Sequence, residues 1–92
     1  MSWEAKDIHD VVKNSKAAGW YFFDRDTIKF WNTTIETELF DNLCFVTSED
    51  NFDRSKILYS VRRYNPEDAS VDTITFQQHS ILEEAIEFAK RQ

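Results

Sequence analysis

The chain of 92 residues contains one glycine and one proline, and this scarcity restricts how it can fold more than any other feature. These two residue types together make up about 12% of an average protein. Collagen-like chains, flexible linkers and glycine-rich phosphate-binding loops are therefore excluded. Hydrophobic residues make up 41% of the chain and aromatic residues 15%, which is enough bulk for one compact core. We therefore expect a single domain over residues 1–92.

Hydrophobic periodicity predicts a helix at each end of the chain. Residues 2–18 have apolar positions at helical spacing. Gly19 follows them, and glycine is the usual residue in the left-handed conformation just past the end of a helix. Residues 80–91 begin with a Ser-x-x-Glu capping box and have a second apolar helical face. The spacing of Ile28, Phe30 and Trp31 predicts a short helix near 26–33.

The segments between the helices have the features of β-strands. Their residues are β-prone or alternate between polar and apolar, at 20–23, 34–40, 43–48, 56–64 and 71–77. The connections between the later strands are too short for crossovers, so we expect antiparallel hairpins. The predicted fold class is α+β: an antiparallel sheet of four or five strands with both terminal helices packed on one face.

The charge balance excludes several classes of partner. Seventeen acidic residues against eleven basic ones give a net charge of −6, which favours neither nucleic acid nor an anionic membrane. Apolar runs such as Trp20–Phe23 are short compared with the about 20 residues of a membrane helix. A single cysteine, Cys44, forms no intramolecular disulfide, so we expect a reducing, cytoplasmic location.

The sequence contains no motif for catalysis, a metal or a cofactor. His9 and His79 lie far apart, and neither has further ligands at the spacing of a zinc site. Cys44 lies in an apolar strand and is interpreted as a small buried hydrophobe. Ser60, His79 and Asp72 occur without a strained nucleophile turn. We therefore expect no enzyme, no metal and no cofactor.

Acidic residues are concentrated in the first half of the chain. Residues 1–50 hold ten acidic and five basic residues, whereas residues 51–92 hold seven and six. Six acidic side chains are candidates for a negative patch that binds a basic partner surface: Asp7, Asp10, Asp24, Asp26, Glu36 and Glu38. The alternative is that these charges only keep the protein soluble. Trp20 and Trp31, from the aromatic excess, are candidate anchors in the same interface.

Four segments resemble a family of small phage and prophage proteins. They are GWYFF at 19–23, RDTIKF at 25–30, FVTSE at 45–49 and LYSVRR at 58–63. The resemblance covers about residues 19–77 and implies an origin in a mobile element. Small acidic phage proteins without catalytic motifs are similar, as a group, to inhibitors of host defence, including anti-CRISPR proteins. This analogy of size, charge and origin assigns no residue.

Two hypotheses of function follow. The first is a binding protein in the host cytoplasm that inhibits a host protein or nucleoprotein complex, such as a nucleic-acid-guided defence complex, by occluding a basic surface. The alternative is a small accessory nucleic-acid-binding domain that uses an open sheet face, with Tyr59, Arg62, Arg63 and Tyr64. Arg62 and Arg63 are neighbours in a strand, so they point to opposite faces, and stacking over a tyrosine or pairing with a carboxylate is the commoner role. Direct nucleic-acid binding is therefore not expected.

Overall fold

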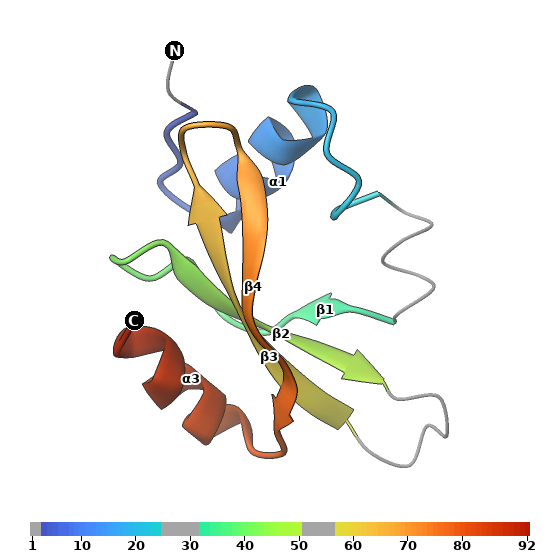
Figure 1. Ribbon diagram of the computed structural model, residues 1–92, viewed down its shortest axis with the longest axis vertical. Coiled ribbons are helices and arrows are strands. Elements are labelled where there is room, and N and C mark those ends of the chain that lie inside the picture. Colours follow the sequence, from blue (N-terminus) through green and yellow to red (C-terminus); the bar gives the residue numbers. More distant parts are fainter. Residues whose placement is uncertain (1–2, 25–31, 51–56) are drawn as a thin grey trace.

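The computed structural model describes residues 3–24, 32–50 and 57–92. Its elements are α1 (Ile8–Ala17), β1 (Thr34–Ile35), β2 (Cys44–Asp50), β3 (Ile57–Asn65), β4 (Ser70–His79) and α3 (Leu82–Lys90) (Figure 1). The four strands form one antiparallel sheet in the order β1-β2-β3-β4. The predicted single-domain α+β fold is confirmed. Most of the short helix expected near 26–33 lies outside the described residues.

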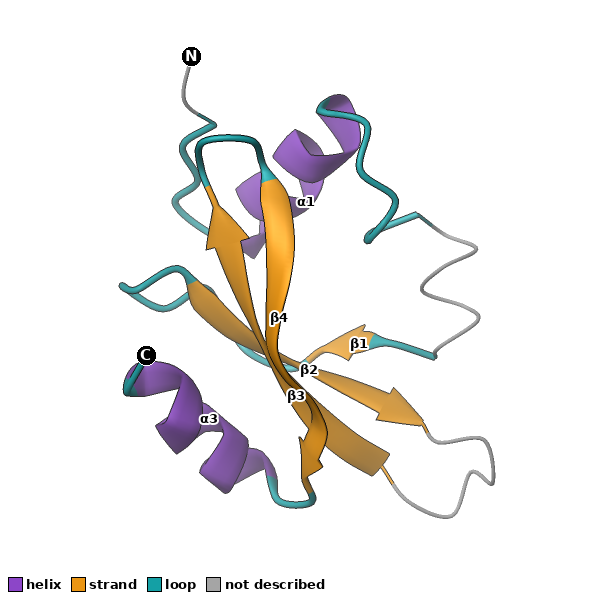
Figure 2. Ribbon diagram, in the orientation of Figure 1, coloured by secondary structure: helices purple, strands orange, loops and turns teal. Residues whose placement is uncertain are grey.

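The two helices cover opposite faces of the sheet, so the prediction that they share one face is wrong. Cys44 and Val46 of β2 belong to the hydrophobic cluster that contains Ala85 of α3, whereas Phe45 between them belongs to the cluster that contains Val11 of α1. Successive side chains of a strand point to opposite faces. Both faces of β2 are therefore apolar, and one-sided packing would have left Phe45 exposed. Figure 2 shows the helices near different ends of the long, twisted β3–β4 ribbon.

Helix α1 begins at Ile8, later than the predicted start at residue 2. Asp7 is the N-cap residue, and its Oδ1 accepts a hydrogen bond from the N–H of Asp10 at 2.9 Å. This bond satisfies one of the donors that a helix leaves unpaired at its start. The side-chain cap therefore fixes the helix start at Asp7.

The first hairpin is more irregular than its alternating sequence suggests. β1 is limited to Thr34–Ile35, and beyond it the hydroxyl of Thr37 accepts the N–H of Val46 at 3.0 Å. This side-chain contact takes the place of a regular ladder bond. The left-handed residue of the turn is Leu43, with φ of 67°. The side chain of Asn42, next to it, donates to carbonyls at the end of α3.

The last strand pair forms as the sequence predicts, and so does α3 except at its start. The hairpin of β3 and β4 forms as predicted, and Ala85 and Ala89 of α3 are fully buried against the sheet. The predicted capping box at Ser80 is wrong, because the N-cap residue is Ile81 and it makes no side-chain cap bond. Neither described helix is long and apolar enough to cross a membrane.

Candidate binding surface

The segment after α1, residues 20–24, is rich in aromatic side chains, and we call it the aromatic turn. Gly19 directs the chain into it with a left-handed φ of 91°. The N–H of Gly19 donates to the carbonyl of Lys16 at 3.1 Å, and the N–H of Trp20 donates to the carbonyl of Ser15 at 3.0 Å. This is the Schellman pattern of a helix end. The predicted glycine stop is therefore confirmed.

The strand predicted at Trp20–Phe23 is wrong. These residues form a turn in which the N–H of Asp24 donates to the carbonyl of Tyr21 at 3.0 Å. Trp20 is 45% exposed and Tyr21 is 75% exposed, so only part of the aromatic run is buried. A run of consecutive aromatic residues shows neither the period of a strand nor that of a helix. Such a run is therefore as compatible with a turn that is anchored by its side chains as it is with a strand.

Two contacts attach the aromatic turn to the sheet, one on each side of Tyr21. Before it, Nε1 of Trp20 donates to the backbone carbonyl of Asp68, between β3 and β4, at 2.8 Å. After it, the ring of Phe22 lies against the guanidinium of Arg62 on β3, with 4.8 Å between Cζ and the ring centroid. Both neighbours of Tyr21 are therefore held, while Tyr21 itself is exposed to solvent.

Phe23 anchors the aromatic turn in the hydrophobic core. It is 2% exposed, and its ring meets Phe22 edge to face, with centroids 4.7 Å apart and an interplanar angle of 83°. Its other neighbour is Phe45 of β2, stacked at 6.4 Å. Aromatic pairs at these separations are favourable beyond the area they bury. The aromatic turn is therefore attached to the same sheet face as α1.

Arg62, which holds Phe22, is part of a buried ion pair. Its Nη2 lies 2.5 Å from Oε1 of Glu49, and the two side chains are 7% and 0% exposed. Glu49 also accepts hydrogen bonds from the hydroxyls of Thr47 and Ser60, each at 2.9 Å. Arg62 donates further to the hydroxyls of Thr73 and Thr47, at 2.5 and 3.2 Å. Burial of the two charges is thus compensated by direct pairing and by neutral donors and acceptors.

The strand register brings this network together. Thr47 of β2 is paired with Ser60 of β3. Glu49 and Arg62 each lie two residues further along these strands, so their side chains point to the same face of the sheet as those of Thr47 and Ser60. The guanidinium of Arg62 also lies 5.6 Å from the ring centroid of Phe76 on β4. The predicted pairing of an arginine with a carboxylate is confirmed for Arg62, whereas the rings against its guanidinium belong to Phe22 and Phe76 and not to a tyrosine. Arg63 next to it is exposed, and alternation places its side chain on the opposite face of the sheet.

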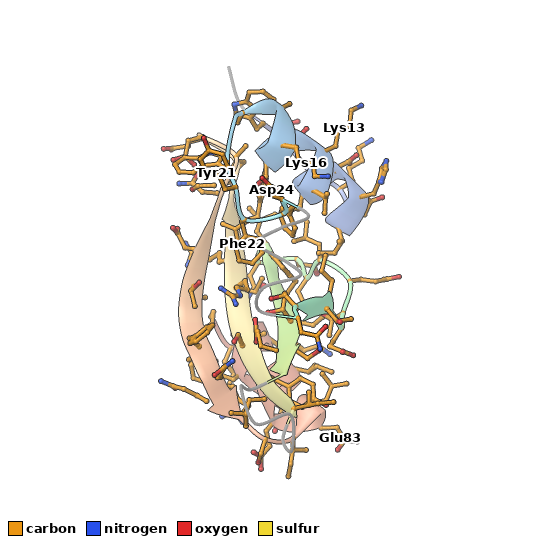
Figure 3. All side chains as sticks on the ribbon, turned by 90° about the vertical axis from the view of Figure 1, so that its right-hand side faces the viewer. Lys13, Lys16, Tyr21, Phe22, Asp24 and Glu83 are labelled. Carbon is orange, nitrogen blue, oxygen red and sulfur yellow. The ribbon has the colours of Figure 1, made fainter. Side chains whose placement is uncertain are left out.

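Tyr21 forms part of a shallow hollow at the surface. The hollow has a volume of about 360 Å³ and is lined by Lys16, Gly19, Trp20, Tyr21 and Asp24. Figure 3 shows Lys16, Tyr21 and Asp24 at the α1 end of the molecule, while Glu83 of α3 lies at the other end. Two predicted site residues, Trp20 and Asp24, are therefore brought together here.

Two other predicted acidic residues lie at the start of α1. Asp7 is exposed and caps the helix, and Oδ2 of Asp10 accepts the backbone N–H of Lys6 at 3.1 Å. Acidic groups at this position are favourable because they face the positive end of the helix dipole. Both residues therefore stabilise the start of α1.

The remaining predicted site residues lie beyond the aromatic turn. Glu36 and Glu38 are exposed in the segment between β1 and β2, and Oε1 of Glu36 accepts the hydroxyl of Ser48 at 2.7 Å. Asp26 and Trp31 lie outside the described residues. The described members of the predicted patch thus lie at three places: the start of α1, the aromatic turn and the β1–β2 connection.

The alternative arginine and tyrosine surface is divided between the two faces of the sheet. Arg62 is 6% exposed and Tyr64 is 1% exposed, on the face of the aromatic turn and α1. Tyr59 is half-buried in the cluster under α3, and alternation places Arg63 on that same face. These four residues therefore do not form one open face.

Cys44 lies in the apolar interior of the protein. Cys44 is fully buried, as predicted, and burial raises the pKa of its thiol, an effect that the charge of Arg63 partly offsets. A buried, protonated thiol is a poor nucleophile. In the part of the chain that the structure describes, no group of three or more His, Cys, Asp or Glu side chains is placed to hold a metal ion.

Comparison with known proteins identifies a family. Residues 7–90 match a family described as a family of unknown function, DUF7447. The chain belongs to this family. The DUF7447 match begins at the N-cap of α1 and ends at the last residue of α3, so it includes the aromatic turn and the buried ion pair. No curated protein and no solved structure matches the chain significantly.

Proposed function

We propose that the protein is a binding protein, without enzymatic activity of its own, that covers a basic surface of another protein. The observation that carries the proposal is the exposure of Trp20 and Tyr21, at 45% and 75%, in a hollow that also contains Asp24. Tyrosine and tryptophan dominate the energetics of many protein interfaces, because they bury a large area at a small entropic cost. Acidic groups around such an anchor favour a basic partner.

The net charge of −6 supports the same proposal. A charge of this size steers a basic partner toward the protein over distances of about a Debye length, roughly 8–10 Å at physiological salt. In the phage setting that the sequence resemblance implies, the target is a nucleic-acid-binding surface of a host defence complex, such as a nucleic-acid-guided nuclease, in the host cytoplasm. Occlusion of that surface would inhibit the complex.

The test compares two charge reversals of equal size. One variant carries Asp24→Lys, Glu36→Lys and Glu38→Lys, and the matched control carries Glu83→Lys, Glu84→Lys and Glu87→Lys on the exposed side of α3. Tagged forms of both variants and of the natural chain are used for affinity capture from a host lysate. Binding kinetics are then measured with the captured partner.

We expect the first variant to lose the partner and the control to keep it. With the natural chain, higher ionic strength should slow association much more than it accelerates dissociation, because long-range charge acts mainly on encounter. The contrast between the two variants is the supporting result, since capture of some protein alone does not distinguish the mechanisms. Equal binding by both variants would contradict occlusion through charge complementarity.

A further inference from the structure

Tyr21 is the most exposed large hydrophobic side chain among the described residues, at 75%. An exposed side chain on a flexible loop loses conformational freedom when it binds, and this cost weakens the interaction. Here the cost is reduced, because Trp20 is tethered to Asp68 and Phe22 is stacked on Arg62. The fold thus holds the backbone of Tyr21 between two attached residues and leaves its ring exposed to a partner.

The charge of the protein favours a cation as the ligand of Tyr21. The net charge is −6, and Asp24 lines the same hollow as Tyr21. Lys16 is the other charged residue in this lining, so the preference for a cation comes from the ring of Tyr21 and from the net charge of the protein, not from an excess of carboxylates in the hollow.

Arginine fits these groups better than lysine does. Its planar guanidinium stacks on an aromatic face and donates from its edge to carboxylates, and it loses hydration more readily than an ammonium group. The interior of the protein contains the same combination, where the guanidinium of Arg62 lies against Phe22 and donates to Glu49. An aromatic ring with nearby carboxylates is therefore a combination that already binds a guanidinium in this fold.

We propose that Tyr21 is the anchor of the interface and that it receives an arginine side chain of the basic partner, with the carboxylate of Asp24 at the edge of the guanidinium. The proposal rests on the proposed function and adds the chemistry of the contact. It predicts that the partner presents an exposed arginine at the centre of its basic surface.

The test uses short peptides instead of the unidentified partner. Acetyl-Gly-Arg-Gly-amide is titrated into the ¹⁵N-labelled chain, and NMR follows the indole N–H of Trp20 and the backbone N–H groups of Tyr21 and Asp24. The peptide with citrulline in place of arginine has the same shape without the charge, and the lysine peptide has the charge without the planar group. We expect the arginine peptide to bind roughly two- to fivefold more tightly than the citrulline peptide, the range of an exposed cation–π contact. We also expect it to bind more tightly than the lysine peptide, because only the planar guanidinium stacks on the ring.

Two variants locate the site. Tyr21→Ser should remove the preference for the arginine peptide. Ile57→Ser, which removes another exposed apolar side chain at the start of β3, should leave the preference unchanged. Both substitutions are at exposed positions, and an unchanged NMR spectrum away from the substituted residue confirms that each variant is folded.

Equal binding of the arginine and citrulline peptides, equal binding of the lysine peptide, or a preference that survives Tyr21→Ser would each overturn the proposal. None of these results bears on the charge-reversal experiment, which uses the captured partner. Conversely, equal capture by both charge-reversal variants would overturn occlusion while leaving the arginine preference at Tyr21 intact. The two failures are therefore distinguishable.

Discussion

Arg62 and Glu49 form an ion pair that is almost completely removed from solvent, with 2.5 Å between Nη2 and Oε1. Each partner also has neutral hydrogen-bonding groups, so neither charge depends on the other alone. A pair of this kind is costly to break, because removal of one side chain leaves an uncompensated charge in the interior. The same pair holds Phe22 and, through it, the aromatic turn.

Single substitutions in this pair should be strongly destabilising. We expect Arg62→Met or Glu49→Leu to lower the free energy of unfolding by about 3–5 kcal/mol. The double variant should lose much less than the sum of the two, because neither charge is then buried without its partner. Urea unfolding of the four proteins measures this double-mutant cycle. Additive losses would show that the two charges are not coupled.

The start of α3 offers a stabilising substitution. Ile81 is the N-cap residue, has extended dihedral angles of −123° and 127°, and makes no side-chain cap bond. Ile81→Asp supplies a carboxylate oxygen for the unpaired N–H groups and should raise the free energy of unfolding by about 1 kcal/mol. Denaturant unfolding is the measurement. Ser80→Ala is the control, and a loss of about 1 kcal/mol there would show that Ser80 caps the helix after all.

The buried face of α3 should not tolerate charge. Ala85 is 0% exposed against β2 and β3, so Ala85→Asp places a carboxylate in an apolar contact and should cost several kcal/mol out of a total of about 5–15. We expect a variant that is largely unfolded by circular dichroism. Glu84→Lys on the exposed side of the same helix should leave the melting curve almost unchanged. Similar curves for both variants would contradict the assigned helix face.

Asp68 should titrate below the ordinary range of aspartate. Hydrogen bonds from the side chain and the backbone of Ser70 lower the pKa of its carboxyl in the folded state. A lowered folded pKa stabilises the protein at pH values above the unfolded value of 3.8, and this contribution is lost as pH falls through the folded pKa. Carboxyl ¹³C NMR measures the titration. In Ser70→Ala the pKa should rise only part of the way, because the backbone bond remains.

Some features of the two helices were predictable from the sequence, and one was not. The stop at Gly19 and the burial of Ala85 and Ala89 were predictable, because a single glycine after a periodic segment and a regular apolar spacing each have one interpretation. The sheet face that each helix covers was not predictable. Alternation assigns residues to two faces of β2, but it does not say which helix crosses to which side.

The candidate binding surface was predicted only in part. Trp20 and Asp24 were identified from the aromatic and acidic excess, but Tyr21 was missed, because its position depends on the tether between Trp20 and the β3–β4 turn. The pairing of Arg62 with Glu49 specifically depends on strand register. The available signal was a pair of opposite charges in two β-prone strands, where a buried charge requires a partner.

The strand order β1-β2-β3-β4 has a consequence for how fast the protein folds. Each strand is paired with the next one along the chain, so each ladder closes a short loop and loses little chain entropy before its contacts form. Folding rates rise when contacts are close in sequence, and we expect folding on the order of milliseconds. The hairpin of β3 and β4 is a natural nucleus. The side-chain bond from Asn42 to the carbonyl of Ala89 joins residues far apart in the chain, and contacts of this kind should form after the transition state.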